Sequence, residues 1–131
     1  MKYLVDTSIC IAAKRDPAVV KWLEANEKDL AISVWTLAEL WHGVVKSESH
    51  GKKREHELFR KISEMAVLAF GRETAIHLAE LFHRQEKRGV RMKMKDCIIA
   101  ATALEHGLSL VTIDVGDFQH TGLKLVNPSR K

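Results

Sequence analysis

The sequence opens with Tyr3-Leu4-Val5-Asp6-Thr7-Ser8, a short apolar run that ends in one acidic and two hydroxyl-bearing side chains. Apolar runs of this length, bounded by polar residues, are typical of strands buried in parallel sheets. Four further runs of the same kind follow at wide intervals. They are Leu30-Ala31-Ile32, Val67-Leu68-Ala69-Phe70, Leu108 to Thr112, and Leu123 to Val126. We therefore predict about five strands, the last of them at an edge of the sheet.

Segments with helical periodicity separate these strands. Asp16-Pro17 is a helix start, with Asp as N-cap and Pro in the first turn, and Ser33 can cap the helix after the second strand. Glu73 to Arg88 is amphipathic, and Asp96 to Glu105 is apolar nearly all round, which predicts a buried helix. For the amphipathic helix we predict an inward face made of Ala75, Leu78, Ala79 and Phe82. The alternation indicates an α/β fold with a mostly parallel central sheet between helices.

Length and composition predict one globular domain over residues 1–131. No apolar run approaches the ~20 residues that a membrane-spanning helix needs, and Asp6 interrupts the first apolar run too early for a secretory signal. We therefore expect a cytoplasmic protein that does not enter a membrane. In a reducing compartment Cys10 and Cys97 are expected to be small buried hydrophobic residues. The net charge of +4 permits a polyanionic partner without requiring one.

Acidic residues stand at informative places in this pattern. Asp6 follows the first strand, Glu39 lies in the first turns of the helix after the second strand, and Asp114 follows the fourth strand. The carboxyl ends of parallel strands lie at one edge of a sheet, where α/β proteins bind ligands. Asp96 begins the buried helix, so it joins the other three only if the preceding loop returns to that edge.

Carboxylates held close together repel one another and need protons or cations to coexist. Mg²⁺ and Mn²⁺ suit oxygen ligands, can supply a bound water as nucleophile, and neutralise charge on a phosphodiester. Each residue also has a structural alternative. Asp6 and Asp96 can cap helices, Glu39 can be a solvated helix residue, and Asp114 and Asp117 can form a turn. The apolar surroundings of Glu39 and Asp96 favour paired or metal-bound carboxylates.

Four segments, in order, resemble a known family. They are Leu4 to Ser8, Ile32 to Leu40 with Gly43, Asp96 to Ala101, and Leu110 to Phe118. Over nearly the whole chain this set resembles the PIN-domain nucleases, and most closely the VapC toxins of prokaryotic toxin–antitoxin pairs. The resemblance implies a three-layer α/β/α fold and an endoribonuclease that hydrolyses RNA with Mg²⁺ or Mn²⁺.

The resemblance also assigns roles to residues and partners. The positions that match the family's acidic metal-binding and catalytic residues are Asp6, Glu39, Asp96 and Asp114. Supporting positions are Asp117, Thr7, Ser8 and Thr112. Members form homodimers and are inhibited by a cognate antitoxin, which lies in a groove near the active site. Candidates for this surface are Trp22, Trp35 and Trp41, although core packing also suits Trp22 and Trp41. Trp35 shares a helical face with Glu39 and is the preferred exposed aromatic residue.

The stretch before Asp96 departs from the family pattern, because it reads Arg91-Met92-Lys93-Met94-Lys95 where these toxins often have a weakly charged segment with glycine. Our hypothesis is that Arg91, Lys93 and Lys95 contact RNA phosphates near the metal. Contacts of this kind position a nucleic acid without reading its sequence.

Three alternatives remain open on the sequence. A housekeeping PIN nuclease of RNA processing would carry the same residues, although the small single domain favours the toxin. A phospho-acceptor receiver domain would need an acidic pair after the first strand and an acceptor Asp after the third. Here Asp6 stands alone and the third strand ends in Phe70-Gly71. A non-catalytic binding module that kept the fold would not need the full acidic set.

Overall fold

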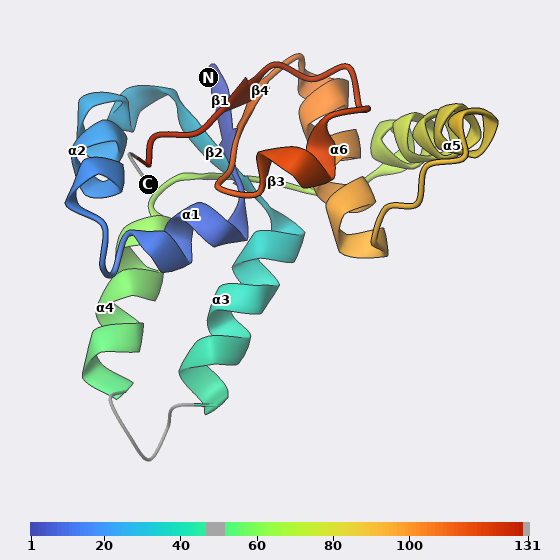
Figure 1. Cartoon of the computed structure of the whole chain (residues 1–131). Coiled ribbons are helices and arrows are strands. Elements are labelled where there is room, and N and C mark those ends of the chain that lie inside the picture. The colour runs from blue at the N-terminus through green and yellow to red at the C-terminus, as the bar shows by residue number, and fades with distance from the viewer. Residues whose placement is uncertain (47–51, 130–131) are drawn as a thin grey trace.

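The computed structural model describes residues 1–46 and 52–129, with backbone only at 52–55 and 58 (Figure 1). Its sheet has five strands in the order β3-β2-β1-β4-β5, and every neighbouring pair is parallel. The strands are β1 (Tyr3–Val5), β2 (Leu30–Ser33), β3 (Ala66–Leu68), β4 (Ser109–Val111) and β5 (Leu125–Val126). The predicted parallel sheet with a final edge strand is confirmed, although β3 is shorter than the predicted run and starts one residue earlier.

Six α-helices and two short 3₁₀ helices connect these strands in the described part of the chain. They are α1 (Thr7–Ala12), α2 (Pro17–Ala25), η1 (Glu27–Asp29), α3 (Val34–Lys46), α4 (Lys52–Ser63), α5 (Arg72–Arg88), α6 (Met94–His106) and η2 (Val115–Phe118). Two helices differ from the sequence prediction. Helix α1 was not predicted, and it forms because the Asp6 side chain accepts the first free backbone N–H, that of Thr7. Helix α6 begins at Met94, two residues before Asp96.

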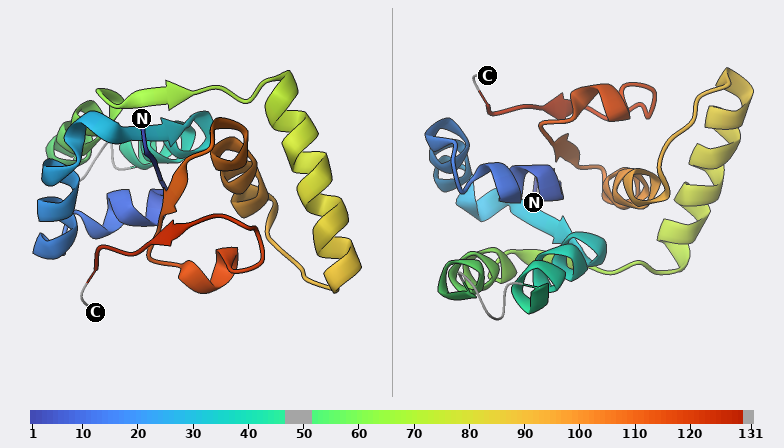
Figure 2. Two further views of the ribbon diagram at one scale, coloured as in Figure 1. Left: turned by 90° about the horizontal axis from the view of Figure 1, so that it is seen from above. Right: turned by 60° about the horizontal axis from the view of Figure 1, so that its bottom comes forward.

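Helices cover both faces of the sheet, which confirms the three-layer α/β/α architecture (Figure 2). Successive strand residues point to opposite faces. Leu4 and Leu110 pack in a core with residues of α5, α6 and η2, whereas Val5 and Val111 pack with α1, α2, α3 and α4 on the other side. This two-sided burial explains why the strands read as continuous apolar runs.

Helix α5 turns inward a face that only partly matches the prediction, since Leu78 and Phe82 are half-buried and pack against the core as expected. Thr74, Leu81 and Gln85 are buried, whereas Ala75 and Ala79 are exposed. The buried positions recur at intervals of four and seven residues, and the two alanines lie about 100° further round the helix. The prediction was wrong for Ala75 and Ala79, because the polar Thr74 and Gln85 occupy part of the inward stripe.

The strand order creates a switch point between β1 and β4. From β1 the chain moves to β2 and β3 on one side, and it then crosses to β4 on the other side of β1. The element after β1 packs on one face, through Ile9, and the element after β4 packs on the other, through Phe118. Ligands of open α/β sheets bind in the crevice that such a divergence leaves at the carboxyl ends of the strands.

Two further expectations concern burial. Cys10 and Cys97 are both buried free thiols, as predicted. Among the described residues, no helix combines the length and the apolar character needed to cross a membrane.

Candidate active site

Asp6 lies at the switch point, directly after β1, with 6% of its surface exposed. Its Oδ1 accepts the backbone N–H of Thr7 at 2.8 Å, and its Oδ2 accepts the hydroxyls of Ser8 at 3.0 Å and Thr112 at 2.8 Å. Ser8 Oγ in turn accepts the N–H of Ile113 at 3.2 Å. Asp6 therefore caps α1 and is also locked in orientation by polar groups from both strand ends. The predicted supporting residues Ser8 and Thr112 thus lie beside Asp6.

Asp96 reaches the same edge because α6 runs antiparallel to β4, the strand that follows it, and so begins near the strands' carboxyl ends (Figure 1). Asp96 is 7% exposed, and the pKa of its carboxyl group is raised. The causes are burial first, then the negative charges of Asp117 and Asp6, with Lys95 and Lys93 acting in the opposite direction. Asp96 is the third residue of α6 and not its cap, which is Lys93.

Glu39 projects from α3 and is held by a series of hydroxyls. Thr7 Oγ1 donates to Glu39 Oε1 at 2.7 Å and lies 3.1 Å from Thr36 Oγ1. Thr36 is completely buried, and its N–H donates to Ser33 Oγ at 3.1 Å, which caps α3 as predicted. Sequence reasoning assigned Ser33 to capping only and gave Thr36 no part in the site. The place of Thr36 beside Thr7 depends on how β1 and β2 pair, which no local pattern reveals.

The two acids after β4 differ in their surroundings. Asp114 has an exposed side chain, and its backbone N–H donates to Thr112 Oγ1 at 3.0 Å before η2 begins. Asp117 lies within η2 and acts electrostatically on Asp96. The structure therefore brings the exposed Asp117 into the electrostatic neighbourhood of Asp96, although the sequence ranked Asp114 above Asp117. The metal-binding and catalytic roles of these residues stay predictions.

The donor set fits a hard divalent cation with few protein ligands. In residues 1–46 and 52–129, no three Asp, Glu, His or Cys side chains are grouped closely enough to hold a metal ion. Mg²⁺ keeps several waters and is usually bound through one or two carboxylates, so a closed protein cage is not required. The buried Asp96, raised in pKa by two neighbouring carboxylates, is the group whose charge such a cation would offset.

Two of the three tryptophans are exposed. Trp41 is 47% and Trp35 38% exposed, whereas Trp22 is half-buried with its ring 5.0 Å from that of Tyr3. The preference for Trp35 as the exposed aromatic residue was therefore incomplete. Trp41 rests on Phe59 with a centroid separation of 4.9 Å and leaves much of its ring open. Helices α3 and α4 thus present aromatic surface.

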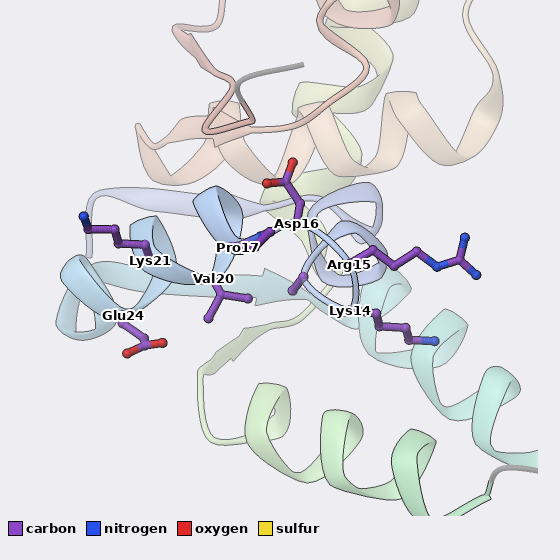
Figure 3. Close-up of a pocket in the computed structure, with 8 residues that line it drawn as sticks. Lys14, Arg15, Asp16, Pro17, Val20, Lys21 and Glu24 are labelled. Carbon is purple, nitrogen blue, oxygen red and sulfur yellow. The ribbon is translucent and has the colours of Figure 1, made fainter.

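A cavity of about 410 Å³ lies away from these acids, at the turn between α1 and α2 (Figure 3). Its walls include Lys14, Arg15, Asp16 and Lys21. None of the predicted site residues lines it. A smaller cavity, of about 190 Å³, has Asp96 and Asp117 in its wall. The candidate active site is therefore next to the smaller cavity.

Comparison with known proteins agrees with this architecture. The family model of the PIN domain matches residues 3–123. Ribonuclease VapC1 of Rickettsia felis is 33% identical over 135 residues, covering 100% of this chain and 99% of the relative. A crystal structure of VapBC2 from Rickettsia felis bound to a DNA fragment from their promoter has a TM-score of 0.84 at 29% identity, covering 97% of this chain and 98% of that one. A toxin–antitoxin complex from Klebsiella pneumoniae has a TM-score of 0.75 at 28% identity, covering 99% and 100%. The chain therefore belongs to the PIN-domain family, and its near-full-length relatives there include VapC ribonucleases.

Proposed function

We propose that this protein is a divalent-metal-dependent endoribonuclease and the toxin of a toxin–antitoxin pair. The observation that carries the proposal is the meeting of Asp6 and Asp96 at the β1–β4 switch point. Two elements distant in sequence bring these nearly buried carboxylates within electrostatic reach of each other. The names of the relatives support RNA as the substrate, since the VapC1 protein of Rickettsia felis is called a ribonuclease.

In this proposal Asp6 and Asp96 would bind Mg²⁺ or Mn²⁺ directly, and Glu39, with Asp114 or Asp117, would contribute through waters that the ion keeps. When bound, such an ion supplies an activated water and neutralises charge on a phosphodiester. The three hydrogen bonds to Asp6 keep its oxygens fixed, so that little reorganisation is needed when substrate binds. Thr7 holds Glu39 in the same way, and Arg91, Lys93 and Lys95 attract the polyanionic substrate.

The proposal is tested with Asp6→Asn and Asp96→Asn on total cellular RNA, in Mg²⁺ or in EDTA. We expect cleavage by the wild type in Mg²⁺ alone and a loss of at least about a hundredfold in each variant. Asp29→Asn is a matched control, because Asp29 lies just before β2, at the opposite edge of the sheet. Cleavage that survives EDTA, or that is equal in all four proteins, contradicts the mechanism.

We further propose that a cognate antitoxin binds this protein and that the protein is a homodimer. The Klebsiella pneumoniae neighbour is a toxin–antitoxin complex, and Trp35 and Trp41 offer exposed aromatic area of the kind that anchors interfaces. Induced expression tests the toxin role. Growth arrest that Asp6→Asn abolishes, and that the product of a small adjacent gene relieves, is the expected result. Normal growth with active ribonuclease favours the housekeeping alternative.

A further inference from the structure

The cavity of about 190 Å³ beside Asp96 has two walls from distant parts of the chain. One wall is the connection between α5 and α6, including Arg91 and Lys93, and the other includes Asp117 and His120 from η2 and the residues after it. Pockets for whole small-molecule ligands are usually larger, about 300–1,000 Å³. This cavity is therefore matched to one small group of a larger ligand.

Groups of both signs line the cavity. Asp96 and Asp117 contribute carboxylates, whereas Arg91, Lys93 and His120 contribute cationic or hydrogen-bonding nitrogen groups. In the described part of the chain, the side chains of Arg91, Lys93 and His120 form no hydrogen bond or ion pair. Arg91 and Lys93 are therefore available to an anion. Lys95, by contrast, lies outside the cavity lining, with Nζ 3.9 Å from Glu39 Oε2.

Gln85 joins the two walls through hydrogen bonds to both of them. This residue of α5 is 4% exposed, and its Nε2 donates to the backbone oxygen of His120 at 3.0 Å and to Met92 Sδ at 3.4 Å. Its neighbour Arg84 donates from Nη2 to the backbone oxygen of Thr121 at 3.4 Å. Gln85 Oε1 is buried without a hydrogen-bond partner among the described residues, so the two bonds from Nε2 alone hold the amide between the walls.

We propose that this cavity is a phosphate subsite for the RNA substrate. It holds the backbone phosphate next to the one that is cleaved, with Arg91, Lys93 and His120 as ligands and Gln85 as the positioning residue. The inference rests on the proposed function, because Asp96 in the cavity wall belongs to the proposed catalytic site. Arg is suited to this role, since its planar guanidinium binds two phosphate oxygens at once.

The test uses the full-length protein and a fluorescent single-stranded 12-nucleotide RNA of mixed sequence. Binding is measured in EDTA over a range of salt concentrations, and cleavage is measured in Mg²⁺. Arg91→Ala and His120→Ala are expected to weaken binding and raise KM, each by about tenfold, with kcat nearly unchanged. Arg91→Ala is also expected to flatten the salt dependence of binding by about 0.7 in the logarithmic slope.

Matched controls are Arg88→Ala and His83→Ala, which remove exposed side chains of α5 outside the cavity. Equal binding by Arg91→Ala, His120→Ala and the wild type overturns the subsite, as does absence of wild-type binding in EDTA, since the subsite needs no metal. If wild-type cleavage persists in EDTA while binding still depends on Arg91 and His120, the metal mechanism fails and the subsite stands.

Gln85 is tested with Gln85→Met, which keeps the length of the side chain and removes its donors. We expect a higher KM with an unchanged salt slope, because the cavity cations remain. We also expect that Gln85→Met adds little to the effect of Arg91→Ala in a double-mutant cycle, because both act on one contact. If the effects of Gln85→Met and Arg91→Ala on KM add fully in the double variant, Gln85 serves only the stability of α5. The same conclusion follows if Gln85→Met lowers kcat alone.

Discussion

Lys95 Nζ lies 3.9 Å from Glu39 Oε2, so a protein cation already faces the carboxylate cluster. Both side chains are partly exposed, and ion pairs of this kind contribute little to stability, about 0–1 kcal/mol. The ion pair therefore affects metal binding more than it affects the stability of the fold. The ammonium group offsets part of the negative charge that a divalent cation would otherwise meet.

Replacing Lys95 is therefore expected to strengthen metal binding. Lys95→Ala should lower the Kd for Mg²⁺ by about two- to fivefold, which corresponds to a weak screened charge interaction. Calorimetric titration with Mg²⁺ and no RNA measures this without any effect on substrate binding. Lys87→Ala, on the exposed face of α5, should leave the Kd unchanged. A weaker affinity for Mg²⁺ in Lys95→Ala would contradict the expected direction.

Asp96 is expected to destabilise the metal-free protein at neutral pH. Its pKa is raised in the fold above the ordinary value of 3.8, mainly by burial and by Asp117. The folded state thus holds a proton that the unfolded state releases, and stability falls as the pH rises above about 3.8. Asp96→Asn should increase Tm by a few degrees at pH 7 in EDTA, and the gain should vanish at pH 3.

Added Mg²⁺ should make the wild type more stable than Asp96→Asn, because a ligand that binds only the folded state stabilises it. Thermal unfolding with and without Mg²⁺ measures the effect, with Asp29→Asn as the control. A wild type that is already more stable than Asp96→Asn in EDTA would show that its carboxylate is satisfied without a cation.

Thr7 is expected to matter through its hydroxyl. Thr7→Val keeps the shape of the side chain but removes the donor that holds Glu39 at 2.7 Å. A hydrogen bond to a charged group contributes about 1.5–3 kcal/mol, so kcat should fall by about tenfold or more. Thr7→Ser should retain most of the activity. Steady-state cleavage of a defined RNA measures both, and equal rates for Thr7→Val and the wild type would exclude this role.

Cys10 is expected to be chemically inert in the folded protein. Burial, with smaller effects of Asp6 and Glu39, raises the pKa of its thiol to about 12. Native protein at pH 8 should therefore react with a thiol reagent only after unfolding. The same shift predicts that stability declines between pH 9.0 and about 12, because only the unfolded state loses the proton in that range. The test uses folded Cys97→Ala protein, in which Cys10 is the remaining thiol. Fast labelling of Cys10 in this protein would contradict its burial.

Much of the fold could be predicted from the sequence because its signals are local. The apolar runs around Leu4 and Leu110 are strands buried on both faces, and Asp16-Pro17 begins a helix as its capping chemistry requires. Helix α1 was missed because six residues carry too little periodicity to be recognised. The inward face of α5 was misassigned because Thr74 and Gln85 are polar residues that only a tertiary contact keeps buried.

The sequence by itself determined which residues could form the site, because acids and hydroxyls after apolar runs must lie at strand ends. It placed Asp6, Glu39 and Asp114 at one edge of the sheet. The resemblance to the PIN-domain nucleases added Asp96 to this set. Only the tertiary structure decided how Asp96 reaches Asp6, that Asp117 is the electrostatic neighbour of Asp96, and that Lys95 faces Glu39 while Arg91 and Lys93 line a cavity. The physical reason is that strand order and helix direction bring together residues that lie up to about a hundred positions apart, and no local pattern of side chains encodes that approach.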